Sequence, residues 1–235
     1  MWPCLTPVSL PGALHPEALY AVSAKLADTL WRMYLPKQFN QPEHAATIMR
    51  GHPFASLVTT DDAGFPFMTH LPLKLVEEGD QPAVLLGHCA RGNPLGAYLQ
   101  QRPLVLASFI GPQAYMSPKV YADLQRVPTW SYLAVQARVQ ARLLDGDEAK
   151  DALLKQLIAD HEPAYAAQWR DLPEDYTGKM LNAITAFELR IIDLQCAVKL
   201  NQHRPEAHAA MHAAYASGNT QEQALAGWMK KLGLV

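Results

Sequence analysis

Three segments between Thr69 and Tyr132 combine residue types that bind ligands. They are Gly87–Pro94, Gly111–Tyr121 and Val127–Tyr132, and each interrupts strand-like sequence. Each one places hydrogen-bonding groups, a positive charge or aromatic rings beside Gly or Pro. Phosphate groups bind to cations and oriented donors, whereas a ring system needs flat apolar walls. The mixture therefore predicts a site for an anionic aromatic ligand.

Short strands must position these segments. Apolar, β-branched runs between turn residues predict strands over Phe54–Thr60, Phe65–Val76, Ala83–His88 and Leu104–Ile110. Apolar and polar residues alternate over Ser131–Leu143, which is typical of a strand with one face in a core and the other in water. A closing strand is predicted around Phe187, Leu189 and Ile191, which alternate in the same way.

Helices are predicted before, between and after these strands. Their expected ranges are Phe39–Arg50, Pro94–Gln101, Asp145–Glu162, Pro173–Leu181, Ala207–Ser217 and Thr220–Leu232. Asn40 and Asn93 are the expected N-caps of the first two, each with Pro in the first turn. Thr220 and Gln223 are expected to form a capping box.

The order of these elements predicts fold class α+β. Five or six strands joined mostly by tight turns, with helices at the ends and one crossover, describe an antiparallel β-barrel and not a doubly wound parallel sheet. Neither Gly-x-Gly-x-x-Gly nor a Gly-Lys-Ser/Thr phosphate loop is present. A ligand must therefore be held by side chains and loop amides.

Composition narrows the classes of function. The chain has 235 residues, of which 49% are hydrophobic and 18% charged, enough for a proper core without a signature of disorder. Its net charge of −2 argues against binding DNA or anionic membranes by bulk charge, although a local basic patch is compatible with it. Cys4, Cys89 and Cys196 are far apart, which favours reduced thiols in a cytoplasm, and no apolar run has transmembrane length.

The chain is predicted to hold one large domain with small appendages. Met1–Arg32 is interpreted as an extension ahead of it, with a short amphipathic helix over His15–Trp31 and no targeting signal. The alternative is an accessory helix that belongs to the domain. The domain itself is expected over Met33–Arg204, and a helical tail over Pro205–Val235.

Short motifs from Met33 to about Ala207 follow the order found in one known family. They are Met33–Lys37 (MYLPK), Pro53–Thr60 (PFASLVTT), Thr69–Leu73 (THLPL), the three ligand-type segments described above, and Lys199–Arg204 (KLNQHR). Through them the chain resembles the PaiB family of FMN-binding split-barrel proteins, which are described as negative transcriptional regulators. Two positions depart from the family pattern, because Ser131 replaces the usual Asn and Ala186 the usual Gly.

The resemblance implies a six-stranded split barrel, a homodimer, and FMN bound in the cleft between subunits. The cofactor-binding residues that it implies are His70, Leu71, His88, Arg91, Asn93, Ser117, Lys119, Tyr121, Trp130, Tyr132, Lys199, Gln202 and Arg204. The FMN phosphate carries close to two negative charges. A helix N-terminus beside Arg91 suits such a group, and so does the cationic pair Lys199 and Arg204.

Each of these residues also has a structural interpretation. His70 is equally typical of an interior histidine bonded to a backbone carbonyl, and Asn93 of a plain N-cap. Ser117–Tyr121 fits a rigid surface turn with packed tyrosines. Trp130 is of a type that most often packs in a core, and Lys199–Arg204 suits a solvated face or a contact with the partner subunit.

Two other kinds of site lack support in the sequence. His208 and His212 share a helix face, but no Glu is placed as in His-Glu-x-x-His and no third ligand is evident, so no metal site is predicted. The absence of Gly-x-Ser-x-Gly argues against a hydrolase triad of that type.

Three functions compete. The first is a dimeric, FMN-binding negative regulator, in which DNA as a partner is implied by the family alone because the sequence shows no basic recognition helix. The second is an FMN-dependent oxidoreductase that uses NAD(P)H on a small substrate, although no acid or base is evident. The third is a dimeric scaffold whose flavin site has decayed, against which the intact Gly87–Pro94 and Lys199–Arg204 segments argue.

Overall fold

The computed structural model describes residues 33–79, 81–123 and 125–235. The expected extension Met1–Arg32, with its helix, lies outside these residues. The chain divides into two units, Met1–Tyr34 and Leu35–Val235. The second unit contains every helix and strand of the described residues.

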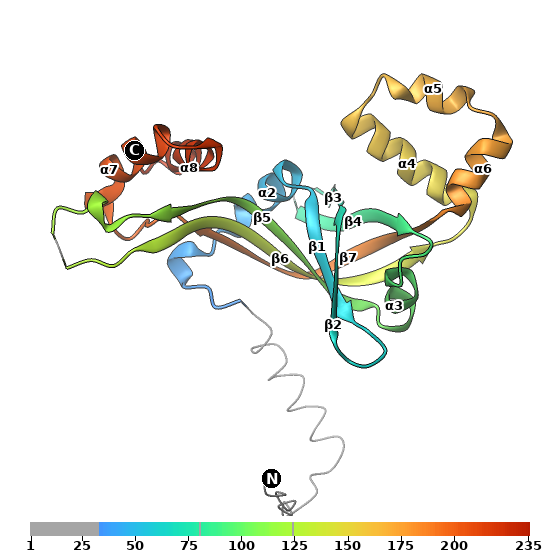
Figure 1. Ribbon diagram of the computed structural model, residues 1–235, viewed down its shortest axis with the longest axis horizontal. Coiled ribbons are helices and arrows are strands. Elements are labelled where there is room, and N and C mark those ends of the chain that lie inside the picture. Colours follow the sequence, from blue (N-terminus) through green and yellow to red (C-terminus); the bar gives the residue numbers. More distant parts are fainter. Residues whose placement is uncertain (1–32, 80, 124) are drawn as a thin grey trace, which may run out of the picture. The chain divides into compact units, whose positions relative to one another are not determined.

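Seven strands form one antiparallel sheet in the described part of the chain, in the order β2-β1-β5-β6-β7-β4-β3. Their bounds are β1 Phe54–Thr60, β2 Pro66–Pro72, β3 Lys74–Glu78, β4 Gln81–Ala90, β5 Leu104–Met116, β6 Thr129–Leu144 and β7 Ile184–Lys199. Only Leu73 separates β2 from β3 in the chain, although they stand at opposite ends of the strand order. The sheet therefore curls back on itself (Figure 1). The predicted α+β antiparallel split barrel is confirmed.

The strand expected over Phe65–Val76 is two strands, which accounts for the seventh. β2 pairs with β1, whereas β3 pairs with β4. The break follows Pro72, which has no N–H to donate to a ladder. The amide of Leu73 donates to the carbonyl of Pro53, 2.9 Å away, so the chain turns toward β1 before the next strand begins.

The strand β5 is longer than predicted. Gly111 and Pro112 were expected to open a loop, but the strand resumes after a register shift at this point and Gln113–Met116 pairs with Thr129–Tyr132. The β5–β6 ladder therefore extends to Met116, and the connecting loop begins only at Ser117. A bulge of this kind bends the ladder without ending it.

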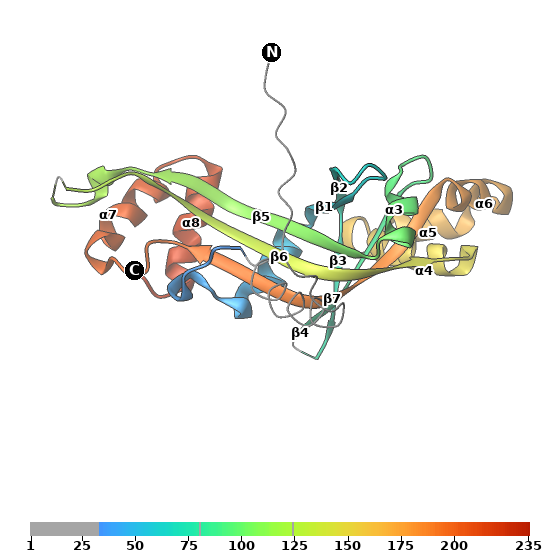
Figure 2. The ribbon, with the colours of Figure 1, turned by 90° about the horizontal axis from the view of Figure 1, so that it is seen from below.

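Helices cover the sheet and extend from its ends. Their bounds are η1 Lys37–Phe39, η2 Pro42–His44, α2 Ala45–Gly51, α3 Leu95–Gln101, η3 Pro118–Val120, α4 Asp147–His161, α5 Tyr165–Asp171, α6 Glu174–Asn182, α7 Pro205–Ala216 and α8 Thr220–Lys231. Helices α4–α6 stand at one end of the β5–β6 hairpin and α7–α8 at the other (Figures 1 and 2). No helix of the described residues is long and apolar enough to span a membrane.

Two expected caps differ from those observed. Asn40 is the C-cap of η1 and not the N-cap of a helix; it lies in an isolated β-bridge with Ala197, so the first predicted helix starts later, as η2 and α2. The capping box of α8 is formed by Asn219 and Glu222, one residue before the pair that was expected. Asn accepts backbone N–H groups at an N-cap at least as well as Thr does, which explains the shift.

The core lies on one face of the sheet, under α2 and the C-terminal helices. Alternate residues of the strands point into it, among them Leu57 of β1, Phe109 of β5 and Val135 of β6. Met211 of α7 and Leu225 of α8 belong to the same buried cluster. The C-terminal helices therefore complete the hydrophobic core of the barrel.

Candidate functional site

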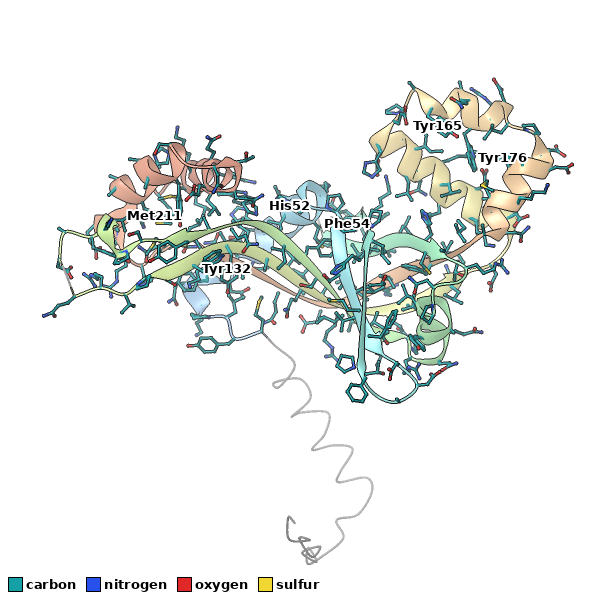
Figure 3. The ribbon with its side chains drawn as sticks, in the orientation of Figure 1. His52, Phe54, Tyr132, Tyr165, Tyr176 and Met211 are labelled. Carbon is teal, nitrogen blue, oxygen red and sulfur yellow. The ribbon has the colours of Figure 1, made fainter. Side chains whose placement is uncertain are left out.

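The predicted site residues fall into two groups. The β7-end group, at the end of β7 nearest α7, contains Tyr121, Trp130, Tyr132, Lys199, Gln202 and Arg204. The β4-end group, where β4 leads into α3, contains His70, Leu71, His88, Arg91 and Asn93. Tyr132 marks the first group, far from Tyr165 and Tyr176 of the α4–α6 helices (Figure 3).

A pocket of about 410 Å³ lies in the β7-end group. Tyr121, Trp130, Lys199 and Arg204, four of the residues that the family resemblance implied, line it. They are joined by residues that the sequence did not single out, namely Arg126, Thr129, Asn201 and His203. Its volume is in the lower part of the range of small-molecule sites.

Lys199 is the central cation of this pocket. Its Nζ donates to the hydroxyl of Thr129 at 2.8 Å and lies 5.7 Å from the centre of the Tyr132 ring. Partial burial lowers the pKa of Lys199 below 10.5. Among the residues that the structure describes, no carboxylate forms an ion pair with it. A partly desolvated ammonium without an acidic partner favours an anionic ligand.

Two arginines of the pocket are already paired with carboxylates. Arg126 contacts Asp123 at 2.8 Å and Glu206 at 3.7 Å, and Arg204 lies 3.9 Å from the same Glu206. The guanidinium of Arg126 also stacks over the Tyr121 ring, 4.8 Å from its centre. These arginines add positive charge to the pocket, but of the three cations Lys199 is the one whose charge no described carboxylate neutralises.

Trp130 supplies the flat wall. Its side chain is 47% exposed, and its indole nitrogen donates to the amide oxygen of Gln113 at 2.9 Å. The ring packs edge to face with Tyr115, with centroids 6.3 Å apart. Trp130 is thus held in place while a large part of it remains available to a ligand.

Four predicted residues of this region do not line the pocket, namely Tyr132, whose ring lies beside Lys199, and Gln202, Ser117 and Lys119. Gln202 uses its amide within the turn, donating to the carbonyl of Val198 at 2.5 Å and accepting from the amide of Leu200 at 2.9 Å. Ser117 accepts from the backbone amide of Lys119 at 3.2 Å and caps η3. The Lys119 side chain is exposed.

Asn93 links the start of α3 to β2. Its side-chain oxygen accepts from the amide of Leu95 at 2.9 Å, although α3 begins one residue later than predicted and its N-cap position is Pro94, and its nitrogen lies 3.4 Å from the hydroxyl of Thr69. The Leu71 side chain is buried in the core, so only its backbone can contact a ligand. The side chain of Arg91 is exposed beside this cap.

The histidines of the β4-end group have different surroundings. His70 is exposed, contacts the hydroxyl of Ser56 through Nδ1 at 3.0 Å and stacks with Phe54. The Nδ1 of His88 is buried, with no hydrogen-bond partner within the described part of the chain. Burial lowers the pKa of His88 below 6.5, which keeps its imidazole neutral near pH 7.

The two groups are too far apart to hold one small ligand within one chain. Residues of β4 next to Arg91 pair with the start of β7, where Cys89 faces Thr185, whereas Lys199 is the last residue of β7. The strand has 16 residues. At about 3.3 Å per residue, Arg91 and Lys199 are separated along β7 by on the order of 45 Å.

Fold and pocket together place the chain among antiparallel split-barrel proteins whose pocket chemistry suits an anionic aromatic ligand. A family model described as "Putative FMN-binding domain" matches residues 33–193. The chain belongs to this family.

A relative of known name shows which proteins of this family the chain resembles. The chain is 33% identical over 177 residues to the protease synthase and sporulation protein PAI 2 of Bacillus subtilis, a match that covers 74% of this chain and 84% of that protein. The resemblance to the PaiB family is therefore confirmed.

Solved structures support the fold. The flavocytochrome Anf3 from Azotobacter vinelandii superposes with a TM-score of 0.53 at 15% identity, covering 70% of this chain and 71% of that one. An FAD and heme binding protein from Mycobacterium smegmatis superposes with a TM-score of 0.52 at 18% identity, covering 68% of this chain and 71% of that one. At these identities the likeness shows the architecture alone.

Proposed function

We propose that this protein is a homodimeric FMN-binding protein that acts as a negative transcriptional regulator. The observation that carries the FMN part is Lys199, a partly buried ammonium that no described carboxylate neutralises, in a pocket walled by the exposed ring of Trp130. A phosphate with an attached ring system satisfies both features.

The residues present fit FMN. Lys199 would bind and orient an anionic end, with Arg126 and Arg204 adding positive charge around it. The indole of Trp130 would cover a ring and exclude water from one face. FMN supplies redox chemistry when it is bound.

The separation of the two groups is the reason to propose a dimer. Arg91 and Lys199 are at opposite ends of β7, so one FMN contacts both only if they come from different chains. The sheet offers a face for such pairing, because Phe54, Met68 and Ile110 on neighbouring strands are 53% to 68% exposed. Pairing through this face would bring the β7-end group of one protomer to the β4-end group of its partner.

Mixed dimers test this arrangement. Arg91→Ala and Lys199→Ala are each expected to weaken FMN binding about tenfold or more without unfolding the barrel, because a charge-assisted contact is lost. Copies with the two substitutions and different tags are co-expressed and the mixed dimer is purified. It retains one site with both Arg91 and Lys199, so it is expected to bind one FMN per dimer with near wild-type affinity.

Each outcome of this experiment is informative. A mixed dimer that binds as weakly as either parent contradicts a site shared between chains. Wild-type protein that stays colourless in excess FMN contradicts FMN binding altogether. Flavin fluorescence and absorbance measure both results, and circular dichroism shows whether the variants are folded.

The regulatory role is supported by the resemblance to the PaiB family and by the matched relative, which is named a protease synthase and sporulation protein. FMN occupancy of the dimer would be the signal that it reports. A gel shift with DNA from upstream of the gene, compared with and without FMN, tests the role. Binding that persists in moderate salt supports it, whereas a shift lost in modest salt indicates nonspecific charge. NAD(P)H-dependent bleaching of bound FMN would instead identify an oxidoreductase.

A further inference from the structure

Asn201 has an unusual backbone conformation. Its φ is +61°, which makes it the one residue other than glycine with a positive φ in the described ranges. It is 6% exposed and lies two residues after Lys199, the last residue of β7. Asn tolerates this left-handed conformation better than most residues, and such conformations concentrate at functional sites.

The side chain of Asn201 links the two walls of the pocket. Its nitrogen donates to the hydroxyl of Tyr121 at 2.9 Å, and its oxygen accepts from that hydroxyl at 3.2 Å. Tyr121 belongs to the β5–β6 loop, residues 117–123 and 125–128, about 80 positions earlier in the chain. The loop and the turn after β7 are therefore joined by a side-chain amide and a phenol.

The backbone of Asn201 is fastened separately. Its carbonyl accepts the amide N–H of Arg204 at 2.9 Å and lies 3.0 Å from Nε2 of His208. Because a carbonyl only accepts, His208 carries a proton on Nε2. His208 is buried on α7, which lies beside η3 at the start of the loop. Asn201 is thus held from the helix side while its side chain holds the loop.

The position of Tyr121 in turn determines the position of Arg126. The guanidinium of Arg126 lies over the Tyr121 ring and lines the same pocket as Lys199. The hydrogen bonds between Asn201 and the Tyr121 hydroxyl therefore also restrict the guanidinium of Arg126 that stacks on the ring. We propose that Asn201 is a positioning residue that clamps the β5–β6 loop to the end of β7 and thereby sets the spacing of Arg126 and Lys199 for an anionic ligand. The ligand side of this inference rests on the proposed FMN function.

Two substitutions remove the clamp with little strain. Asn201→Gly accepts the positive φ but has no side chain, and Tyr121→Phe keeps the ring under Arg126 but has no hydroxyl. Tyr165→Phe, on α5, is the matched control for loss of a phenol. The clamp itself is measured without FMN, by the rate at which trypsin cleaves after Arg126. We expect this rate to rise severalfold in both clamp variants and to stay unchanged in Tyr165→Phe.

Affinity for FMN, measured by flavin fluorescence, is expected to fall about fivefold to tenfold in each clamp variant, as for loss of one buried hydrogen bond. Since both changes break the same link, the double variant is expected to be no weaker than either single one. Additive losses would contradict the clamp, and so would unchanged trypsin cleavage in both single variants. If wild-type protein takes up no FMN but the cleavage rates change as expected, the clamp stands and the FMN function fails.

Discussion

Lys199 faces opposing demands at the scale of a single residue. Partial burial disfavours its charged form and lowers its pKa, while the pocket around it offers no described carboxylate in return. Because the unfolded chain binds this proton more tightly, stability rises as pH increases from the lowered pKa toward 10.5. At neutral pH the residue therefore costs stability and retains affinity for anions.

This conflict makes affinity for FMN sensitive to alkaline pH. As Lys199 loses its proton below its ordinary pKa, FMN binding is expected to weaken between about pH 8 and about pH 10. Lys199→Arg keeps its charge throughout, so its affinity should change less over the same range. Fluorescence titrations at both pH values measure the difference, and the comparison cancels the titration of FMN itself. An equal pH dependence in the two proteins would show that another group is responsible.

Partly buried histidines change stability with pH in the same direction as Lys199, but in the acidic range. Burial lowers the pKa of His44, His52 and His88 below 6.5. The unfolded chain therefore takes up protons more readily as pH falls below 6.5, and stability is lost there. His88→Gln should show a smaller loss in urea midpoint between about pH 7.5 and about pH 5.5 than the wild type. A wild-type midpoint that does not change would contradict this prediction.

At the scale of elements, the C-terminal helices are part of the barrel core. Tyr215, Leu225 and Met229 are almost fully buried, and the hydroxyl of Tyr215 and the amide of Gln221 reach β5. These helices hold β5 where it carries Gln113, the residue that fixes Trp130. The pocket is thus supported by a segment that lies beyond the matched residues 33–193.

Leu225→Ala tests this support. The substitution leaves a cavity between α8 and β5 and should lower the free energy of unfolding by about 2–5 kcal/mol. Lys230→Ala, on the exposed side of α8, is the control and should change stability by less than about 0.5 kcal/mol. Urea unfolding followed by circular dichroism measures both. If Leu225→Ala unfolds α8 alone and leaves the barrel transition unchanged, the helices form a separate unit.

Sequence patterns predicted most helices and strands, because the spacing of apolar residues within each element depends on that segment of the chain alone. The alternation over Ser131–Leu143 correctly indicates β6 and its buried face. The continuation of β5 past Gly111 was missed because a bulge and a turn use the same residues, and only pairing with β6 distinguishes them. The helix α5, which follows Pro163, has only seven residues and therefore too few turns to show a helical period in the sequence.

Some residues of the pocket were predicted from the sequence, and others were missed. Trp130, Lys199 and Arg204 line one pocket, although their residue types alone favoured a core position and a solvated face, and only the family resemblance indicated a binding site. Arg126 and Asn201 were missed, because a loop arginine resembles any solvated charge and the sign of φ is not written in a sequence. The known preference of Asn for positive φ was the one available signal.

At the scale of the whole molecule, the residues that the structure describes leave one face of the sheet exposed. Along β1, β2 and β5, outward-facing residues include Phe54, Met68 and Ile110. Polar Ser56 and Ser108 lie between them at paired positions. Exposed apolar side chains that gather on one face are characteristic of protein interfaces. The proposed dimer would bury this face.

Ile110→Lys tests the assignment of this face. A lysine near its centre would be buried unpaired in the dimer, so dissociation into monomers is expected. Since FMN binding is proposed to require both chains, the monomer should also lose FMN. Tyr176→Lys, at a half-exposed position on α6, is the control and should leave mass and FMN binding unchanged. Analytical ultracentrifugation with absorbance detection in the flavin band reports mass and cofactor together. A folded Ile110→Lys monomer that still binds FMN would separate cofactor binding from dimerisation, and a dimer that persists would place the interface elsewhere.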